Sequence, residues 1–340
     1  MAKIIDPEIT QTRKAHHIDL AFLSQTADNL SDGRFYYEPI LSAHPQEDLP
    51  SFPFLRKKMK APIWISSMTG GTEAAYRINT NLAKVCREFG LGMGLGSCRP
   101  LLESNDRFKD FDLRPIIGDD SPFYANLGIA QLEELIDRKA EDKILDLVHR
   151  LRADGLIIHV NPLQEWLQPE GDTFQRPPIE TILHLLDVLD IPLIVKEVGQ
   201  GMGPESLRAL LKLPLEAVDF GAFGGTNFAK LELLRASEET RELYEPISLV
   251  GHTANEMVEF VNDICEQGNT EINCKQIIIS GGVQDFLHGY YLINKICLPA
   301  VYGQASAFLK YANGDYEVLK SFTQKQIKGL ALANSVLKLK

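Results

Sequence analysis

Short apolar runs recur along the chain at intervals that suit a strand-and-helix repeat. They predict strands at Ile63–Ser67, Leu91–Ser97, Phe123–Leu127, Leu156–Val160, Leu193–Glu197, Val218–Gly221, Gln276–Ser280 and Ala300–Gly303. Helical patterns lie between most of these runs. A strand followed by a helix, repeated about eight times over roughly 250 residues, is typical of a (β/α)8 barrel. We therefore expect the α/β class and a TIM barrel.

Three of the helical segments carry clear signals. The stretch 131–151, "QLEELIDRKAEDKILDLVHRL", has an apolar face at helical spacing, made of Leu132, Ile136, Ala140, Ile144, Leu147 and Leu151. Pro204 in "GPESLRALLKL" suits the first position of a helix. Thr253 and Glu256 in "TANEMVEFVNDI" have the spacing of a capping box. Each segment is expected to form one helix.

The first 60 residues precede the predicted barrel and include the proline-rich stretch "SAHPQEDLPSFPF". A chain of 340 residues suggests about two domains by length, although barrels often run longer as one. No linker divides the remainder. We expect residues 1–60 to form an N-terminal extension that contributes to the site, and residues 61–340 to form the barrel.

Composition narrows the class of partner and the compartment. The net charge of −11 argues against nucleic acid or an anionic membrane as the main partner. The five cysteines have no regular spacing, which favours reduced thiols over a disulfide framework. No apolar run has the length of a transmembrane helix, and "MAKIIDPEIT" lacks the apolar centre of a signal peptide. A cytoplasmic protein is expected.

The segments after the strands hold the candidate chemistry, because the active site of such a barrel is built at the C-terminal ends of its strands. Glycines and hydroxyl residues recur there, in "SMTGGT", "FGGTNF", "SGGV" and "GQAS", where backbone amides can approach a ligand closely. Lys196 stands near the end of an apolar strand, where a buried cation requires a partner. A phosphate-bearing cofactor across the barrel mouth would explain these features together.

The segment 159–172, "HVNPLQEWLQPEGD", places many polar groups after the fourth strand. His159, Asn161, Gln164 and Glu165 either cap a turn and satisfy backbone groups or form part of a binding site. From the residues alone, both interpretations stay open.

The chain resembles the type 2, flavin-dependent isopentenyl diphosphate isomerases. The resemblance is carried by "RKAHHIDLAF", "SSMTGGT", "GLGSCRP", "NLG", "HVNPLQEWLQPEGD", "VKEVGQGM", "FGGTNF", "ISGGV" and "GQASAFL", which cover about residues 13–310 in the order of the family. It implies a reversible 1,3-allylic shift between isopentenyl and dimethylallyl diphosphate. It also implies FMN, Mg²⁺, NADPH as a reductant that keeps the flavin reduced, and a homo-oligomer, tetrameric or octameric.

The resemblance also assigns roles to residues. Those implied to bind the substrate are Arg13, Lys14, Ser97, Arg99, His159, Asn161 and Gln164. Those implied to bind the flavin are Thr69, Gly70, Gly71, Ser97, Asn126, Lys196, Thr226, Gly281, Gly282, Ala305 and Ser306. Glu165 is implied to bind the metal, and Gln164, His159 and Lys196 are implied to be catalytic.

Three positions depart from the pattern of the family. His16 stands where an acidic residue is usual, Cys98 where glutamine is usual, and Gln284 where arginine is usual. Gln284 removes a positive charge near the expected FMN phosphate, and Cys98 puts a thiol in the substrate loop. These departures keep open the alternative of a flavin-binding homologue without isomerase activity. A second alternative is another FMN barrel, an oxidoreductase of the hydroxy-acid oxidase type.

Overall fold

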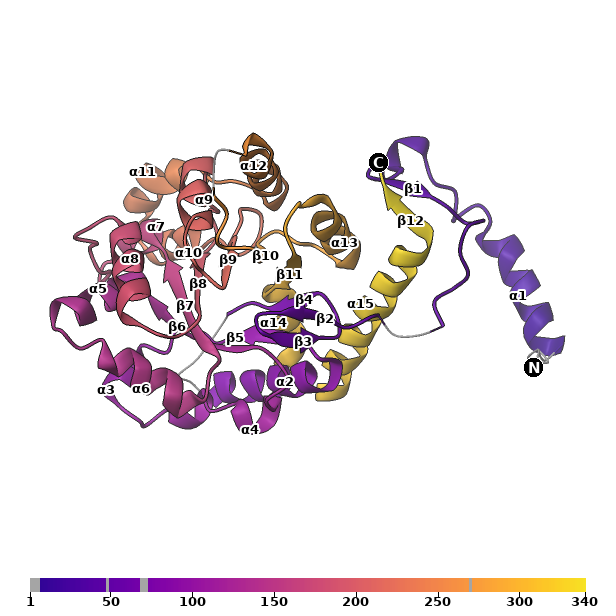
Figure 1. Ribbon diagram of the computed structural model, residues 1–340. Helices are drawn as coiled ribbons and strands as arrows, with labels where there is room; N and C mark the ends of the chain where they lie inside the picture. Colours follow the sequence, from indigo (N-terminus) through magenta and orange to yellow (C-terminus); the bar gives the residue numbers. More distant parts are fainter. Residues whose placement is uncertain (1–6, 47–48, 68–72, 269–270) are drawn as a thin grey trace.

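Eight parallel strands close into a barrel in the computed structural model, which describes residues 7–46, 49–67, 73–268 and 271–340. The strands follow one another around the barrel in chain order, and the last pairs with the first (Figure 1). They are β4 (Ile63–Ile65), β5 (Gly92–Gly94), β6 (Phe123–Gly128), β7 (Gly155–Val160), β8 (Leu193–Glu197), β9 (Ala217–Asp219), β10 (Ile277–Ser280) and β11 (Ala300–Gln304). The predicted (β/α)8 barrel is confirmed.

Helices surround the barrel and connect its strands. They are α2 (Glu73–Phe89), α3 (Pro100–Glu103), α4 (Arg114–Ile117), α5 (Ile129–Asp137), α6 (Asp142–Leu151), α7 (Pro162–Leu167), α8 (Pro178–Val188), α9 (Pro204–Leu211), α10 (Phe228–Arg235), α11 (Glu238–Ser248), α12 (Ala254–Gln267), α13 (Phe286–Lys295), α14 (Ser306–Ala312) and α15 (Tyr316–Val336). Short 3-10 helices lie at Asp28–Leu30 and Phe108–Asp110. Among the described helices, none combines the length and apolar character needed to cross a bilayer.

Alternation along the strands separates two layers of the core. In β4, Ile63 and Ile65 pack outward in the large core under the helices, whereas Trp64 points into the barrel. Inside, Trp64 meets Tyr124 edge to face, with ring centroids 6.2 Å apart. The hairpin of β2 (Phe52–Phe54) and β3 (Lys57–Met59) adds Phe54, Leu55 and Met59 to this inner cluster. These side chains fill the end of the barrel opposite the mouth.

The structure confirms two of the expected helices and corrects the third. Helix α9 begins at Pro204, and α12 follows a capping box between Thr253 and Glu256. The segment 131–151 was expected to be one helix, but it forms α5 and α6 with a turn between them. Lys139 adopts a left-handed conformation with φ 54° there, and the Ala140 amide donates to the Leu135 carbonyl at 2.9 Å. This closing turn ends α5, and helical spacing of apolar residues does not detect it.

The two ends of the chain meet beside the barrel. Strand β1 (Phe35–Tyr37) pairs antiparallel with β12 (Leu337–Leu339), which follows the long helix α15. Before β1, helix α1 (Pro7–Leu20) stands away from the barrel, at the opposite end of the molecule from α11 (Figure 1). The part of the N-terminal extension before β1 therefore stands away from the barrel, whereas its later hairpin β2–β3 packs into the barrel.

Candidate active site

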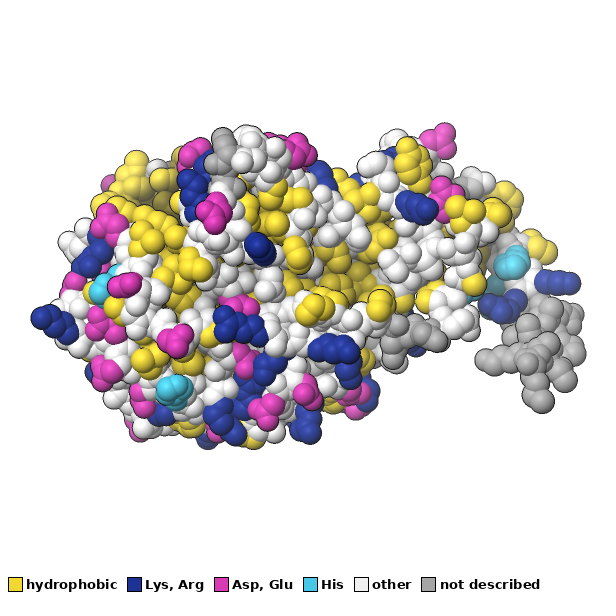
Figure 2. Space-filling model, viewed as in Figure 1, with side chains coloured by type: hydrophobic (Ala, Val, Ile, Leu, Met, Phe, Trp, Pro, Cys, Tyr) yellow, Lys and Arg dark blue, Asp and Glu magenta, His cyan; other side chains and the backbone are white. Residues whose placement is uncertain are grey.

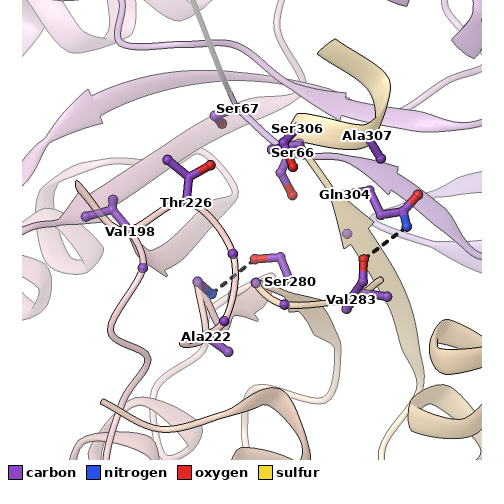
Figure 3. Close-up of a pocket in the computed structure, with 18 of the residues that line it drawn as sticks. Ser66, Ser67, Val198, Ala222, Thr226, Ser280, Val283, Gln304, Ser306 and Ala307 are labelled. Carbon is purple, nitrogen blue, oxygen red and sulfur yellow. Dashed lines mark hydrogen bonds between the residues drawn. The ribbon is translucent and has the colours of Figure 1, made fainter. Parts of the chain in front are cut away.

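A cavity of about 450 Å³ opens where the C-terminal ends of β8 to β11 meet. Its wall includes six of the residues expected to bind the flavin: Lys196, Thr226, Gly281, Gly282, Ala305 and Ser306. Figure 3 shows Thr226, Ser66 and Ser306 facing the same space from different loops. The expected residues Thr69, Gly70 and Gly71 lie outside the described residues. The structure thus brings together segments separated by more than 100 positions in the chain.

Backbone forms much of this wall, and two glycines show why. Gly281 has φ +87°, and a Cβ there would lie 2.1 Å from the carbonyl oxygen of Ala222. Gly221 has φ +53°, and a Cβ there would lie 1.9 Å from the carbonyl oxygen of Glu197. Only glycine permits such close crossing of the chain in a left-handed conformation. The crossing leaves a concave surface of peptide groups and small side chains, which suits an anion such as phosphate.

Hydroxyl groups and one lysine complete the polar character of the cavity. The hydroxyl oxygens of Ser66 and Ser67 are buried and have no hydrogen-bond partner among the described residues. Such groups are normally satisfied, so they fit a site that a polar ligand completes. Lys310 lines the same cavity as Gln284. Lys310 thus supplies a positive charge near Gln284, where the sequence suggests that one is missing. The motif "GQASAFL" ends just before Lys310 and gives no sign of it.

Lys196 is buried at the end of β8, with 8% of its surface exposed, and it also lines the cavity. Its ammonium donates a hydrogen bond to the carbonyl of Glu197 at 2.7 Å. The carboxylate of Glu197 instead accepts from the backbone amides of Gly199, Gln200 and Gly201 at 2.6–2.8 Å. Burial raises the pKa of Glu197, and these bonds oppose the rise. No ion pair joins the Lys196 ammonium to the Glu197 carboxylate within the described residues, and the lysine lines the cavity.

Asp219 is a buried acid that sequence reasoning missed. It lies beside Lys196 in the strand ladder, and the Ser280 hydroxyl donates to one of its carboxylate oxygens. The other oxygen has no hydrogen-bond partner among the described residues. Burial raises the pKa of Asp219, while the charge of Lys196 lowers it. A charged residue in an otherwise apolar strand was the available signal, the same one that singled out Lys196.

His159 and Asn126 connect two neighbouring strand ends. The imidazole Nδ1 and the amide Oδ1 are 2.8 Å apart, and the Asn126 amide donates to the Leu95 carbonyl at 2.9 Å. His159 lies opposite Lys196 in the ladder between β7 and β8. Loss of hydration, together with the nearby charge of Lys196, lowers the pKa of His159 to about 4. The imidazole is therefore neutral at pH 7, with Nδ1 donating to the amide oxygen.

The segment after β7 forms a hydrogen-bonded loop around Glu165. Asn161 donates to Glu165 at 2.9 Å and to Gln164 at 3.1 Å, and the Asp172 amide donates to Glu165 at 2.8 Å. Asn161 is the residue before α7, yet its side chain makes no capping hydrogen bond. Its buried Oδ1 has no partner among the described residues. The polar groups tie the loop together, and simple capping of α7 does not account for them.

Ser97 and Arg99 are exposed beyond the end of β5, and Arg99 lies next to the loop that follows β7. Arg99 forms an ion pair with Asp172 at 3.0 Å, and Gln131 donates to the same carboxylate at 2.9 Å. Cys98 between them is buried, and burial raises the pKa of its thiol to about 12. A reactive thiolate at Cys98 is therefore excluded by its environment, and the residue acts as a small core side chain.

Arg13, Lys14 and His16 lie on α1 with exposed side chains. Figure 1 places α1 far from β7, α7 and the mouth of the barrel. Within this single chain, the two cations are not brought to the residues they were expected to join. Glu165 likewise stands without further metal ligands: no group of three His, Cys, Asp or Glu side chains within the described ranges is placed to hold a metal ion.

The chain is a (β/α)8 barrel with a backbone-lined cavity and a buried lysine at its mouth, and barrels of this class frequently bind phosphate at the loops after their last strands. Solved structures with this fold include a mandelate oxidase with a monooxide FMN adduct, at TM-score 0.54 and 10% identity, covering 90% of this chain and 88% of that one. A flavocytochrome b2 variant with sulfite bound has TM-score 0.59 and 15% identity, covering 95% of this chain and 82% of that one. These similarities establish the fold.

Curated relatives establish the family. A protein of Rickettsia felis named isopentenyl-diphosphate delta-isomerase is 32% identical over 325 residues, covering 94% of this chain and 90% of the relative. One of Rickettsia akari with the same name is 33% identical over 313 residues, covering 91% and 88%. No family model matches the chain. The chain belongs to the isopentenyl-diphosphate delta-isomerase family.

Proposed function

We propose that the protein is the type 2 form of this isomerase and interconverts isopentenyl and dimethylallyl diphosphate with FMN as cofactor. One observation carries the proposal. The backbone-lined cavity reaches Lys196, and Lys196 stands beside His159 in the barrel, next to the polar loop after β7. The C-terminal ends of the strands thus offer a phosphate cradle, a buried cation and a polar loop. A flavin phosphate, a flavin ring and a diphosphate substrate require these three features in that order.

The residues present fit FMN. Gly281, Gly282, Ala305 and Ser306 would hold its phosphate, with Lys310 as the counter-charge. The unpartnered hydroxyls of Ser66 and Ser67 offer donors to its polar parts. Lys196 and Asn126 would lie against the ring. Reduced flavin, when bound, would supply the acid and base chemistry for the allylic shift.

The side chains of the chain itself prepare the reaction. Lys196 holds a positive charge in a buried place, where it would stabilise an anionic flavin ring. The neutral imidazole of His159, fixed by Asn126, presents its free Nε2 beside Gly128 and close to Gln131. Gln164 is uncharged and close to Asn161, so it can border a hydrocarbon without adding a competing acid.

We further propose that Glu165 binds a Mg²⁺ ion that also binds the substrate diphosphate. The carboxylate is already oriented by Asn161 and by the Asp172 amide, as ligating carboxylates usually are. One carboxylate, diphosphate oxygens and water would complete the octahedral set that Mg²⁺ prefers. NADPH would serve only to reduce the flavin. Ser97 and Arg99 at the rim would bind the diphosphate. Arg99 would leave its ion pair with Asp172 and pair with the substrate instead.

His159 also separates this proposal from the oxidase alternative. A hydroxy-acid oxidase needs a base that removes a proton, and a carboxylate partner would strengthen such a histidine. Here the partner is the amide of Asn126, and the pKa of about 4 makes His159 a weak base at pH 7. This environment favours hydrogen bonding to substrate over proton abstraction.

The test is an anaerobic assay with isopentenyl diphosphate, Mg²⁺ and FMN, before and after reduction of the flavin. We expect product only after reduction, with no net consumption of reductant per turnover. Oxidation of NADPH in proportion to product would overturn the proposal in favour of an oxidoreductase. Flavin uptake without any product would identify a flavin-binding homologue that lacks isomerase activity.

A further inference from the structure

A second cavity, of about 740 Å³, lies at the end of the barrel opposite the mouth. Its wall is formed by the hairpin β2–β3, the last turn of α2 and the segments that precede β5 and β6. These segments lie at the N-terminal ends of the strands, whereas the mouth is built at their C-terminal ends. We call this space the basal cavity. The charged residues that line it are Lys57, Lys58, Lys60, Arg87, Asp119 and Asp120.

The cations of the basal cavity are largely uncompensated. Lys58 and Lys60 are exposed, and within the described ranges neither ammonium forms an ion pair or a hydrogen bond. Arg87 makes one weak contact, 3.5 Å from its guanidinium to a backbone carbonyl. Only Lys57 has a carboxylate partner, Asp154 at 3.2 Å. Lys and Arg side chains gather over β3, β5 and α2 with acids between them (Figure 2), although the whole chain carries a net charge of −11.

The loop before β6 is fixed so that two of its amides stay free. The guanidinium of Arg114, which is 3% exposed, donates to the Gly118 carbonyl at 2.9 Å, and Lys57 donates to the Asp119 carbonyl at 2.6 Å. In a trans peptide unit the N–H points away from the C=O. The amides of Asp119 and Asp120 therefore point away from these two cations. Neither amide donates a hydrogen bond to any residue that the structure describes.

Gly90 allows Lys60 to reach the wall of the basal cavity. The Lys60 amide donates to the Gly90 carbonyl at 2.9 Å. Gly90 has φ +63°, and a Cβ there would lie 2.5 Å from the Cγ of Lys60. Because glycine has no side chain, the aliphatic part of Lys60 can lie against the backbone. The fold thus holds this lysine close to the other cations, instead of leaving it free in solvent.

We propose that the basal cavity binds a small anion that carries two or more phosphate groups. Lys58, Lys60 and Arg87 come from separate elements and can contact more than one phosphate, for which the cavity has room. Asp119 and Asp120 offset part of the charge, but their free amides are suitable donors to phosphate oxygens. The acidic chain as a whole disfavours nucleic acid and anionic membranes. No residue of the mouth takes part, so this inference is independent of the proposed function.

The test is binding of inorganic triphosphate, followed by calorimetry and by hydrogen exchange read by mass spectrometry. Triphosphate should protect the amides of residues 118–121 from exchange in the wild type. In Lys58→Glu with Lys60→Glu, the triphosphate concentration needed for this protection should rise by at least about tenfold, because two charge-assisted contacts are lost. Exchange in this segment distinguishes the basal cavity from anion binding at the mouth.

The matched control is Lys325→Glu with Lys328→Glu, which makes the same change of charge at two exposed lysines of α15. It should bind triphosphate as the wild type does. Melting curves must show that both variants are folded, and Lys58→Gln with Lys60→Gln repeats the test with a milder change. Equal weakening in the control would reduce the effect to general charge attraction and overturn the proposal. Calorimetric binding without protection of residues 118–121 would place the anion elsewhere, with the same consequence.

Three further ligands identify what the basal cavity recognises. Equal affinity for ATP and triphosphate would mean that the phosphates alone are bound, and tighter binding of ATP would mean that a nucleotide is preferred; both results support the proposal. Orthophosphate should bind more weakly than triphosphate, and equal affinity would contradict the need for two or more phosphates. Tighter binding of an acidic peptide than of triphosphate would overturn the proposal in favour of a protein partner.

Discussion

The two halves of the barrel mouth are built in different ways. On the side of β8 to β11, the wall is made of glycines, hydroxyls and backbone that the crossing of chain segments holds in place. On the side of β5 to β7, the wall is a network of side chains in which Arg99, Glu165 and Asp172 hold one another. Lys196, on the border between them, lines the cavity and lies opposite His159.

The contrast indicates how each half responds to change. A wall of backbone has no side chain to remove, so it is damaged by adding atoms and is almost indifferent to pH. A network of side chains is damaged by removing a charge or a hydrogen bond, and its parts compensate one another. The first half therefore suits an invariant ligand such as a cofactor phosphate, and the second suits a substrate that enters and leaves.

The largest effect is expected where atoms are added to the backbone wall. Gly281→Ala places a Cβ 2.1 Å from the Ala222 carbonyl oxygen at a left-handed position. The strain costs about 1–3 kcal/mol of stability, and the shifted loop should weaken flavin binding by at least about a hundredfold, equivalent to ~2.7 kcal/mol. Flavin titration followed by fluorescence, beside a melting curve, measures both.

Gly33→Ala is the matched control, since a Cβ at Gly33 would meet nothing within 4 Å. It should leave flavin binding and stability unchanged. Normal flavin binding by Gly281→Ala would show that the cavity between β8 and β11 is not the phosphate site.

A smaller effect is expected in the side-chain network. Glu165→Gln should raise the Mg²⁺ concentration needed for activity by at least about tenfold and leave flavin binding intact. Loss of the carboxylate that accepts the Asp172 amide costs about 1 kcal/mol of stability. Gln164→Ala, at the adjacent position, should lower kcat more than it changes the Mg²⁺ response. An unaltered Mg²⁺ titration for Glu165→Gln would remove this residue from the metal site and leave it a loop-forming role.

His159 predicts a pH dependence of stability. Burial lowers its pKa from 6.5 to about 4, so the unfolded chain binds more protons than the folded one between these values. The stabilisation is complete above pH 6.5 and is lost as pH falls toward 4, by at most about 1.4 kcal/mol per pH unit. Denaturant titrations at several pH values give the free energy of unfolding at each pH. For His159→Gln, this free energy should change less with pH than in the wild type. An identical pH dependence of the free energy of unfolding in both proteins would place the pKa of His159 near its ordinary value.

The smallest effect concerns the ion pair at the rim. Both Arg99 and Asp172 are more than one-third exposed, so solvent screens their attraction. Arg99→Ala should therefore change stability by less than about 1 kcal/mol, yet raise KM for the diphosphate substrate clearly. Asp172→Asn, which frees Arg99, should change KM in the opposite direction. Equal effects of both substitutions on KM would mean that the pair only orders the loop.

Local sequence was sufficient for much of the fold. Alternating and helical apolar patterns located all eight barrel strands and two of the three singled-out helices, because burial of one face selects the secondary structure. The same logic marked Lys196 as unusual, since a lysine in an apolar strand must be buried. The resemblance then named six of the residues that line the cavity, which the structure groups together.

Tertiary structure alone decided which of these groups meet. The Asn126 partner of His159 is 33 residues away and the Asp172 partner of Arg99 is 73 away, and no local pattern encodes either contact. Closure of the barrel also placed Asp219 beside Lys196 and added Lys310 to the cavity. The N-terminal segment before β1 shows the same division. Its sequence determines a cationic, apolar segment, but only the fold reveals that the barrel of the same chain leaves it exposed. The path of the chain carries this segment away from the barrel, so the two are not close enough to pack together.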